Sequence, residues 1–246
     1  MKSNIIMHLL QINLYPEKYP ALDQYPFNLD IFLRTKKIEF ISPVTFFAGE
    51  NGTGKSTLLE AISLKCGVHI WKNEERARFI SNPYENQLYQ CMSVKWSNGT
   101  VPGSYFGSQI FQHFTQLLDE WATGDPGLLK YFGGESLITK SHGESLMSFF
   151  KARYKIKGVY FLDEPETALS PNSQIELLEI LNQTMKSDDV QFIIATHSPI
   201  LLACPEATIY NFNHIPVKKI DYEQTDYYRI YKEFMEDRAK YIKNLK

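Results

Sequence analysis

Residues 49–57 read GENGTGKST, and this short run decides how the rest of the chain is interpreted. It fits the pattern G-x-x-x-x-G-K-[ST], in which glycines let a loop turn tightly and bring backbone N–H groups close to a phosphate. Lys55 is expected to reach the β- and γ-phosphates of a nucleotide, and the Ser56 hydroxyl to bind Mg²⁺. The candidate phosphate-binding residues are Gly49, Glu50, Asn51, Gly52, Thr53, Gly54, Lys55, Ser56 and Thr57.

The sequence on both sides of this loop supports the same interpretation. Residues 43–48 (PVTFFA) are apolar and β-prone, which predicts a buried strand that enters the loop. Residues 56–62 (STLLEAI) predict a helix whose N-terminus faces the bound anion. The alternative interpretation is a glycine-rich turn that occurs by chance before a helix. It does not explain why a strand, the loop, a Lys-Ser pair and a helix follow one another in this order. The loop predicts a nucleoside triphosphate without choosing between ATP and GTP.

A second buried strand is predicted over residues 158–162, and it ends in paired carboxylates, Asp163 and Glu164. In α/β folds such a strand delivers its last side chains to the edge of the sheet where ligands bind. Alone, the two acids could simply be solvated residues at a strand end. Behind a phosphate-binding loop, Asp163 is expected on the metal side and Glu164 as the general base for the attacking water. Glu166 is a weaker candidate.

Two further motifs contribute candidates to the same site. Residues 191–195 predict another buried strand, and His197 follows it at the position from which a side chain can donate to a γ-phosphate. Residues 141–145 read SHGES, a capping box that begins a helix. A capped helix N-terminus with small residues is also an anion site, so Ser141 and Gly143 are candidate nucleotide contacts.

Taken together, GENGTGKST, SHGES, YFLDEPETALSP (160–171) and ATHSP (195–199) resemble, in order and spacing, the ATP-binding-cassette (ABC) class of P-loop ATPases. The resemblance covers roughly residues 35–212 and is closest to small stand-alone bacterial ATPases of the AAA family type. SHGE resembles a variant of the LSGGQ signature of the class. Two departures stand out: His142 and Glu144 replace the usual Gly and Gln, and Ser170 replaces the usual Asp of the D-loop.

The resemblance implies an α/β fold of the ABC-cassette type, with a mostly parallel sheet flanked by helices and an antiparallel N-terminal edge. It implies one ATPase domain over residues 1–246, of which about 67–140 is a variable helical lid. ATP and Mg²⁺ are the implied cofactors. The implied partner is a second copy of the chain, bound in the presence of ATP so that Ser141 and Gly143 of one subunit face the γ-phosphate held by the other.

Composition limits the alternatives. A chain of 246 residues with 43% hydrophobic content can bury a full core, and its net charge of −2 does not indicate nucleic-acid binding. Three widely spaced cysteines favour a reduced compartment, and no apolar run is long enough to span a membrane. We therefore expect a cytoplasmic protein with no transmembrane segment of its own.

Some assignments stay open at this level. In the ABC class an aromatic residue upstream of the loop stacks on adenine, and Tyr25 or Phe27 could serve. The glutamine that contacts Mg²⁺ in the class could be any of Gln87, Gln90, Gln109 and Gln112. Helical spacing of apolar residues predicts amphipathic helices over 104–122 and 226–245. The second should bury Tyr227, Ile230, Phe234, Tyr241 and Leu245.

Three functions remain for an ATPase of this class. The chain could be a stand-alone ATP-gated switch that acts on an unknown client. It could be the ATP-binding subunit of a membrane transporter, although ordinary transporter cassettes keep LSGGQ. It could also be a DNA-repair or phage-defence ATPase. Such a protein would lack coiled-coil arms, because the segment 58–140 is too short for long arms and carries no sustained heptads.

Overall fold

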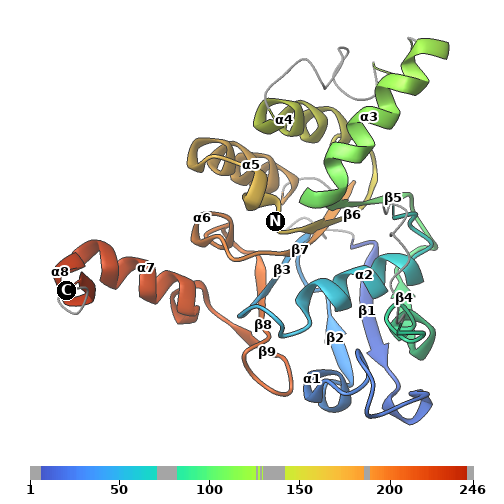
Figure 1. Cartoon of the computed structure of the whole chain (residues 1–246), viewed down its shortest axis with the longest axis vertical. Helices are drawn as coiled ribbons and strands as arrows, with labels where there is room; N and C mark the ends of the chain where they lie inside the picture. Colours follow the sequence, from blue (N-terminus) through green and yellow to red (C-terminus); the bar gives the residue numbers. More distant parts are fainter. Residues whose placement is uncertain are drawn as a thin grey trace, which may run out of the picture.

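A six-stranded sheet with the order β5-β6-β7-β3-β8-β9 forms the centre of the fold (Figure 1). The computed structural model describes residues 7–70, 82–125, 127, 129, 142–185 and 189–242. Strands β5 to β8 run parallel to their neighbours in this sheet, and β9 pairs antiparallel with β8. The strands are β3 (Val44–Ala48), β5 (Gly103–Gly107), β6 (Gly158–Asp163), β7 (Val190–Ala195), β8 (Thr208–Asn211) and β9 (Lys218–Ile220).

A second, three-stranded antiparallel sheet has the order β2-β1-β4. It contains β1 (Leu9–Leu14), β2 (Lys37–Glu39) and β4 (Met92–Trp96). The predicted combination of a mostly parallel sheet with an antiparallel N-terminal part is thus confirmed. Within the segment 67–140, β4 joins this antiparallel sheet and β5 joins the parallel one, so the described part of that segment is not purely helical.

Helices cover both faces of the parallel sheet (Figure 1). On one face lies α2, and on the other lie α4, α5 and α6, while α3 extends from the end of β5. The helices are α1 (Asp30–Arg34), α2 (Lys55–Lys65), α3 (Ser108–Gly124), α4 (His142–Arg153), α5 (Pro171–Thr184), α6 (Pro199–Leu202), α7 (Asp226–Glu236) and α8 (Arg238–Ile242). Among the described residues, none of these helices combines the length and apolar character that a membrane span needs.

Strand β3 shows why its sequence is apolar throughout. Successive side chains point to opposite faces, so Val44 and Phe46 enter the core beneath α4, α5 and α6, whereas Phe47 enters the core beneath α2. Every residue of the strand is buried. Burying one such phenylalanine contributes about 1.5–3 kcal/mol, so the two cores hold β3 and the loop that follows it in a fixed position.

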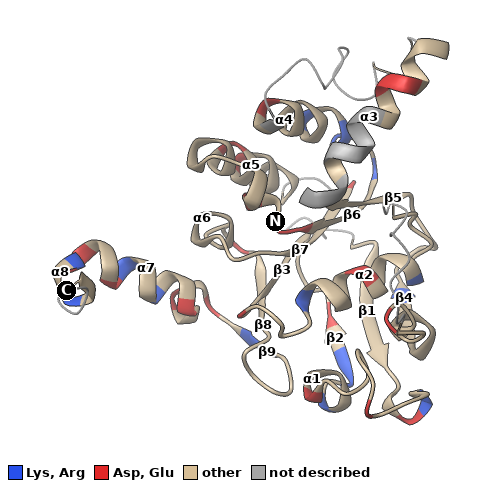
Figure 2. Ribbon diagram, in the orientation of Figure 1, with Lys and Arg blue, Asp and Glu red and all other residues tan. Residues whose placement is uncertain are grey.

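Two expectations about helices need correction. The helix predicted from Ser104 begins at Ser108, because residues 103–107 pair with β6 and Phe106 packs from a strand. The predicted C-terminal helix is divided into α7 and α8, and of its predicted apolar stripe Tyr227 is partly buried, Ile230, Phe234 and Tyr241 are exposed, and Leu245 lies outside the described residues. Ile230 is 51% exposed and Phe234 is 37% exposed. The two helices extend away from the sheets with acidic and basic positions interspersed along them (Figures 1 and 2).

Candidate nucleotide site

The loop between β3 and α2 has the backbone that its glycines predict. Gly49 and Gly54 adopt φ values of +148° and +94°. A Cβ atom on Gly54 would lie 2.8 Å from the Phe32 ring, and one on Gly49 would lie 3.0 Å from Asn213 Oδ1. The positive φ favours glycine at both positions, and at Gly54 the space beside Phe32 is also too small for a Cβ atom. Gly54 is also the residue before α2, where no side chain caps the first backbone N–H groups of the helix.

Lys55 is buried at the start of α2, with 4% of its surface exposed. Its Nζ donates to the carbonyl oxygens of Gly49, at 2.6 Å, and Glu50, at 2.8 Å, so the side chain lies back along the loop. Burial lowers the pKa of Lys55, while the carboxylates of Glu164 and Asp163 act in the opposite direction. A buried ammonium held along a glycine-rich loop is a site for phosphate oxygens.

Ser56 and Asp163 meet between α2 and the end of β6. The Ser56 hydroxyl donates to Asp163 Oδ1 at 2.7 Å, and the Tyr105 hydroxyl donates to Asp163 Oδ2 at 3.1 Å. Burial raises the pKa of Asp163 to about 6, against the lowering effect of these two hydrogen bonds. Tyr105 was not predicted from the sequence. It lies on β5, and no motif near it indicates that this strand pairs with β6.

The Ser56 and Asp163 oxygens fit a magnesium ion. Mg²⁺ prefers hard oxygen ligands and usually keeps several waters beside one or two protein ligands and the substrate phosphates. Within the described part of the chain, no three His, Cys, Asp or Glu side chains form a metal-binding group. One hydroxyl and one carboxylate suit an ion whose other ligands are phosphate oxygens and water.

Glu164 follows Asp163 in a left-handed conformation, with φ 46° and ψ 53°. This conformation costs a non-glycine residue roughly 1–2 kcal/mol and is held by surrounding contacts. The Glu164 N–H donates to the Ala195 carbonyl at 2.9 Å, which fixes the residue beside the end of β7. Its carboxylate Oε1 lies 3.0 Å from His197 Nε2. The predicted base and the predicted γ-phosphate donor are thus in contact.

The backbone of His197 is fixed by Glu166, which was a weaker candidate than Glu164 for the general base. The His197 N–H donates to Glu166 Oε1 at 2.5 Å, and the preceding Thr196 N–H donates to the Phe47 carbonyl at 3.1 Å. These contacts place the histidine beside the end of β3. Burial is the main cause that lowers the pKa of His197, and Lys55 adds to it. Glu166 therefore has a positioning contact here.

The first turn of α7 also contacts the site, which the sequence did not predict. The Tyr227 hydroxyl lies 2.9 Å from the Gly49 carbonyl oxygen and contacts His197 Nδ1. Asn213 Oδ1 accepts from the Glu50 N–H at 2.7 Å. Both residues come from the C-terminal part of the chain, far from the loop in sequence, so only the tertiary fold identifies them.

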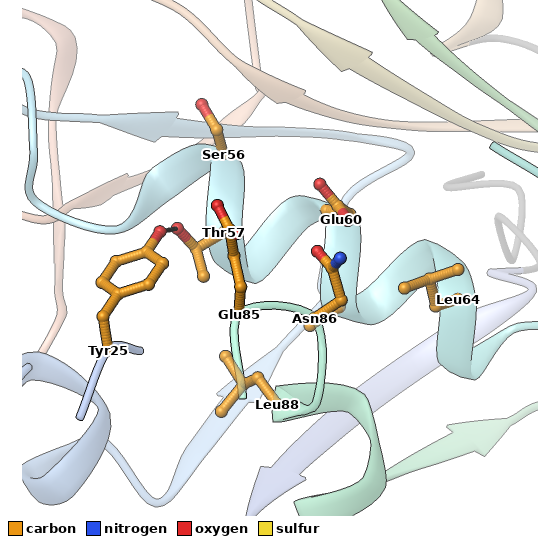
Figure 3. Close-up of a pocket in the computed structure, with 9 residues that line it drawn as sticks. Tyr25, Ser56, Thr57, Glu60, Leu64, Glu85, Asn86 and Leu88 are labelled. Carbon is orange, nitrogen blue, oxygen red and sulfur yellow. Dashed lines mark hydrogen bonds between the residues drawn. The ribbon is translucent and has the colours of Figure 1, made fainter. Parts of the chain in front are cut away.

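Tyr25 lines a pocket of about 170 Å³ beside the start of α2 (Figure 3). Its hydroxyl hydrogen-bonds to Thr57 Oγ1 at 2.5 Å, and 39% of the residue is exposed. Phe27, the alternative candidate for adenine stacking, is fully buried against Tyr19 and Tyr84 and has no face free for a base. Tyr25 is therefore the one of the two that a base can reach.

The remaining predicted residues belong to the SHGES run or are the four candidate glutamines. Ser141 lies outside the described residues. Gly143 is in the first turn of α4, where a Cβ atom would lie 3.5 Å from the Ala168 carbonyl. Gln87 donates to the Pro83 carbonyl and Gln90 is exposed, and the structure describes neither the Gln109 nor the Gln112 side chain. The choice of glutamine therefore stays open.

Comparisons with known proteins agree with this architecture. Residues 146–203 match the family model described as "AAA domain, putative AbiEii toxin, Type IV TA system". Among solved structures, the chain is similar to cbiO1 from Clostridium perfringens, described as part of the ABC transporter complex cbiONQ. The identity is 15%, the match covers 95% of this chain and 97% of that chain, and the TM-score is 0.51.

The chain is also similar to the SMC head domain from Thermotoga maritima, with 14% identity over 87% of this chain and 99% of that chain and a TM-score of 0.43. No curated protein sequence matches. The fold is that of an ABC-class P-loop ATPase, as the sequence resemblance implied, and the family match supports the same class. The match begins at residue 146, so the role of the SHGES run stays a prediction.

Proposed function

We propose that this chain binds Mg·ATP in the loop at residues 49–57 and hydrolyses it. The observation that carries the proposal is one cluster at the carboxyl edge of the parallel sheet. In it, Ser56 bonds Asp163, Glu164 contacts His197, and the buried Lys55 lies along the loop between them. Phosphoryl transfer to water needs a buried cation, a pair of metal ligands, and a base beside a hydrogen-bond donor.

Each residue has a distinct role in the proposed reaction. The loop backbone and Lys55 bind and orient the β- and γ-phosphates. Ser56 and Asp163 would hold Mg²⁺, which supplies positive charge against the phosphate oxygens. Glu164 takes the proton of the attacking water, and His197 Nε2 donates to the γ-phosphate. Tyr25 is the proposed adenine contact, because its ring is exposed beside the start of α2.

We further propose that ATP brings two copies together. Gly143 lies in the first turn of α4, near the Ala168 carbonyl, and α4 packs on α5. The resemblance to the ABC class implies that the start of α4 faces a nucleotide held by a second subunit. A symmetric pair satisfies both sites with one self-complementary interface. The chain would then act as an ATP-gated switch on a client.

A transporter subunit is the second candidate function. It is favoured by the similarity to cbiO1, which is described as part of an ABC transporter complex and is matched over 95% of this chain. The two candidates share the nucleotide site and differ in the partner. Co-purification of the chain with an integral membrane protein would favour the transporter subunit. Isolation as a soluble ATP-dependent dimer would favour the switch.

The proposed activity is tested by phosphate release from ATP with the purified chain. Release should depend on Mg²⁺ and disappear when the metal is chelated, because Ser56 and Asp163 leave most of the coordination to phosphate and water. Lys65→Ala, at the far end of α2, is the matched control and should release phosphate at the wild-type rate. No release above the protein-free blank at saturating Mg·ATP would exclude hydrolysis by the isolated chain.

A further inference from the structure

The first turn of α7 places one tyrosine hydroxyl between two parts of the nucleotide site. Tyr227 is the second residue of α7, and its hydroxyl lies 2.9 Å from the Gly49 carbonyl while also contacting His197 Nδ1. The Tyr227 and His197 rings pack edge to face, with centroids 5.3 Å apart and an interplanar angle of 88°. A hydroxyl carries a single hydrogen, so it can donate to only one of these two partners.

The other contacts of His197 decide which partner receives that hydrogen. A neutral imidazole carries one N–H, and burial together with Lys55 favours the neutral ring. His197 Nε2 lies 3.0 Å from Glu164 Oε1, and a carboxylate oxygen can only accept. The imidazole hydrogen therefore belongs on Nε2. Nδ1 is then an acceptor, and the group next to it that can donate is the Tyr227 hydroxyl.

The Gly49 carbonyl does not need the tyrosine hydrogen. Lys55 Nζ already donates to this oxygen at 2.6 Å. Donation from Tyr227 to His197 Nδ1 therefore leaves no acceptor of the loop without a partner. If Tyr227 donated to Gly49 instead, the Nε2–H tautomer would place an unprotonated Nδ1 opposite the lone pairs of the hydroxyl. The Nδ1–H tautomer would place an unprotonated Nε2 opposite the Glu164 carboxylate. The hydrogen-bond count thus favours Nδ1 as the acceptor.

We propose that Tyr227 is a positioning residue that donates its hydrogen to His197 Nδ1 and thereby holds the Nε2–H tautomer. This inference rests on the proposed function, in which Nε2–H is the group that donates to the γ-phosphate. A ring held in the other tautomer would present a lone pair to the phosphate and repel it. Tyr227 touches neither phosphate nor water in this role and acts through the histidine alone.

A second contact keeps the start of α7 against the loop. Asn213 Nδ2 donates to Asp226 Oδ2 at 2.9 Å, and Asn213 Oδ1 accepts from the Glu50 N–H at 2.7 Å. The first two residues of α7 are thus linked to the first two residues of the loop. This arrangement holds the Tyr227 hydroxyl at His197 even though the rest of α7 extends away from the sheets (Figure 1).

The direct test is nitrogen-15 NMR of the His197 imidazole in the full chain without nucleotide. The wild-type spectrum should show a protonated Nε2 and an Nδ1 that accepts a hydrogen bond. In Tyr227→Phe the ring packing is retained and the donor is lost, so the Nδ1 resonance should move to the position of an unbonded nitrogen. Tyr228→Phe is the matched control, because its hydroxyl contacts Lys232 at the helix surface, and it should leave the His197 signals unchanged.

Kinetics supply the second readout. Tyr227→Phe should lower kcat for ATP about tenfold, the effect of one lost hydrogen bond, with KM changed less than about threefold. In a His197→Ala background the same substitution should cause no further loss, because the tyrosine acts through the histidine. Melting temperatures of all variants, measured beside the spectra, show whether each one is folded.

Two results would overturn the inference. One is a wild-type His197 that carries its hydrogen on Nδ1, since Tyr227 would then be an acceptor. The other is a folded Tyr227→Phe variant whose Nδ1 resonance and kcat both equal those of wild type. Failure of the wild-type chain to hydrolyse ATP would instead count against the proposed function, and the tautomer measurement needs no nucleotide. The two failures are therefore distinguishable.

Discussion

Substituting Lys55 by alanine removes the one buried cation that lies along the loop. The ammonium makes two hydrogen bonds, both to loop carbonyls, and the residue is 4% exposed. In the nucleotide complex it would make a charge-assisted bond to phosphate, which is worth about 1.5–3 kcal/mol. The dissociation constant for Mg·ATP should therefore rise about 10- to 150-fold at 25 °C.

The structure also predicts that the Lys55→Ala variant folds. In the variant the Tyr227 hydroxyl, 2.9 Å from the Gly49 carbonyl, can turn its hydrogen from His197 Nδ1 to that carbonyl, and the carbonyl of Glu50 still accepts from Thr53 Oγ1 at 2.8 Å. Neither acceptor is left buried and unpaired, which is the usual source of a large loss of stability. A loss of ATP binding can then be attributed to the missing ammonium.

Calorimetric titration with ATP in excess Mg²⁺ measures the change directly. Lys65→Ala removes a lysine from the same helix, at its last residue, and should bind ATP like the wild type. The melting temperature of each protein shows whether it is folded. Equal dissociation constants for the wild type and a folded Lys55→Ala variant would refute the assignment of the loop as the phosphate site.

The remaining predictions concern pH and assembly. The pKa of His197 is lowered from its ordinary value of 6.5, so below that pH the unfolded chain takes up a proton more readily than the folded chain. The free energy of unfolding should therefore fall more between pH 7.5 and 5.5 in the wild type than in His197→Asn, and equal losses in denaturant titrations would contradict this. Glu164→Gln with saturating Mg·ATP should sediment as a dimer at tens of micromolar, and Ser141→Arg in that background should sediment as a monomer because the arginine clashes across the interface. A monomeric Glu164→Gln would leave SHGES as a capping box only.

The sequence predicted those parts of the site that depend on strand order. Residues Asp163 and His197 each follow an apolar run, and parallel strands place their carboxyl ends at one edge. The run at residues 49–57 by itself predicts phosphate binding, because each residue type in it has a defined role. These predictions needed no knowledge of how distant side chains pack.

The parts that were missed depend on tertiary packing. Tyr105 and Tyr227 contact the site from elements with no motif of their own, and Asn213 reaches the loop from the turn after β8. The apolar stripe of α7 was expected to be buried, because periodicity indicates an apolar face without showing what covers it. Ile230 on that face is 51% exposed. Sequence alone could not locate these contacts or that surface.

The central claim is that ATP is hydrolysed at this site with Glu164 as the base. A single-turnover experiment with Mg·ATP and excess enzyme tests it most directly, with Glu164→Gln compared to Glu166→Gln. Glu164→Gln should retain bound ATP and lose about 10²- to 10⁴-fold in the rate of cleavage, because only the proton-accepting function is removed. Glu166→Gln should cleave ATP close to the wild-type rate, because its amide oxygen can still accept the His197 N–H. Normal cleavage by Glu164→Gln together with an inactive Glu166→Gln would contradict the account.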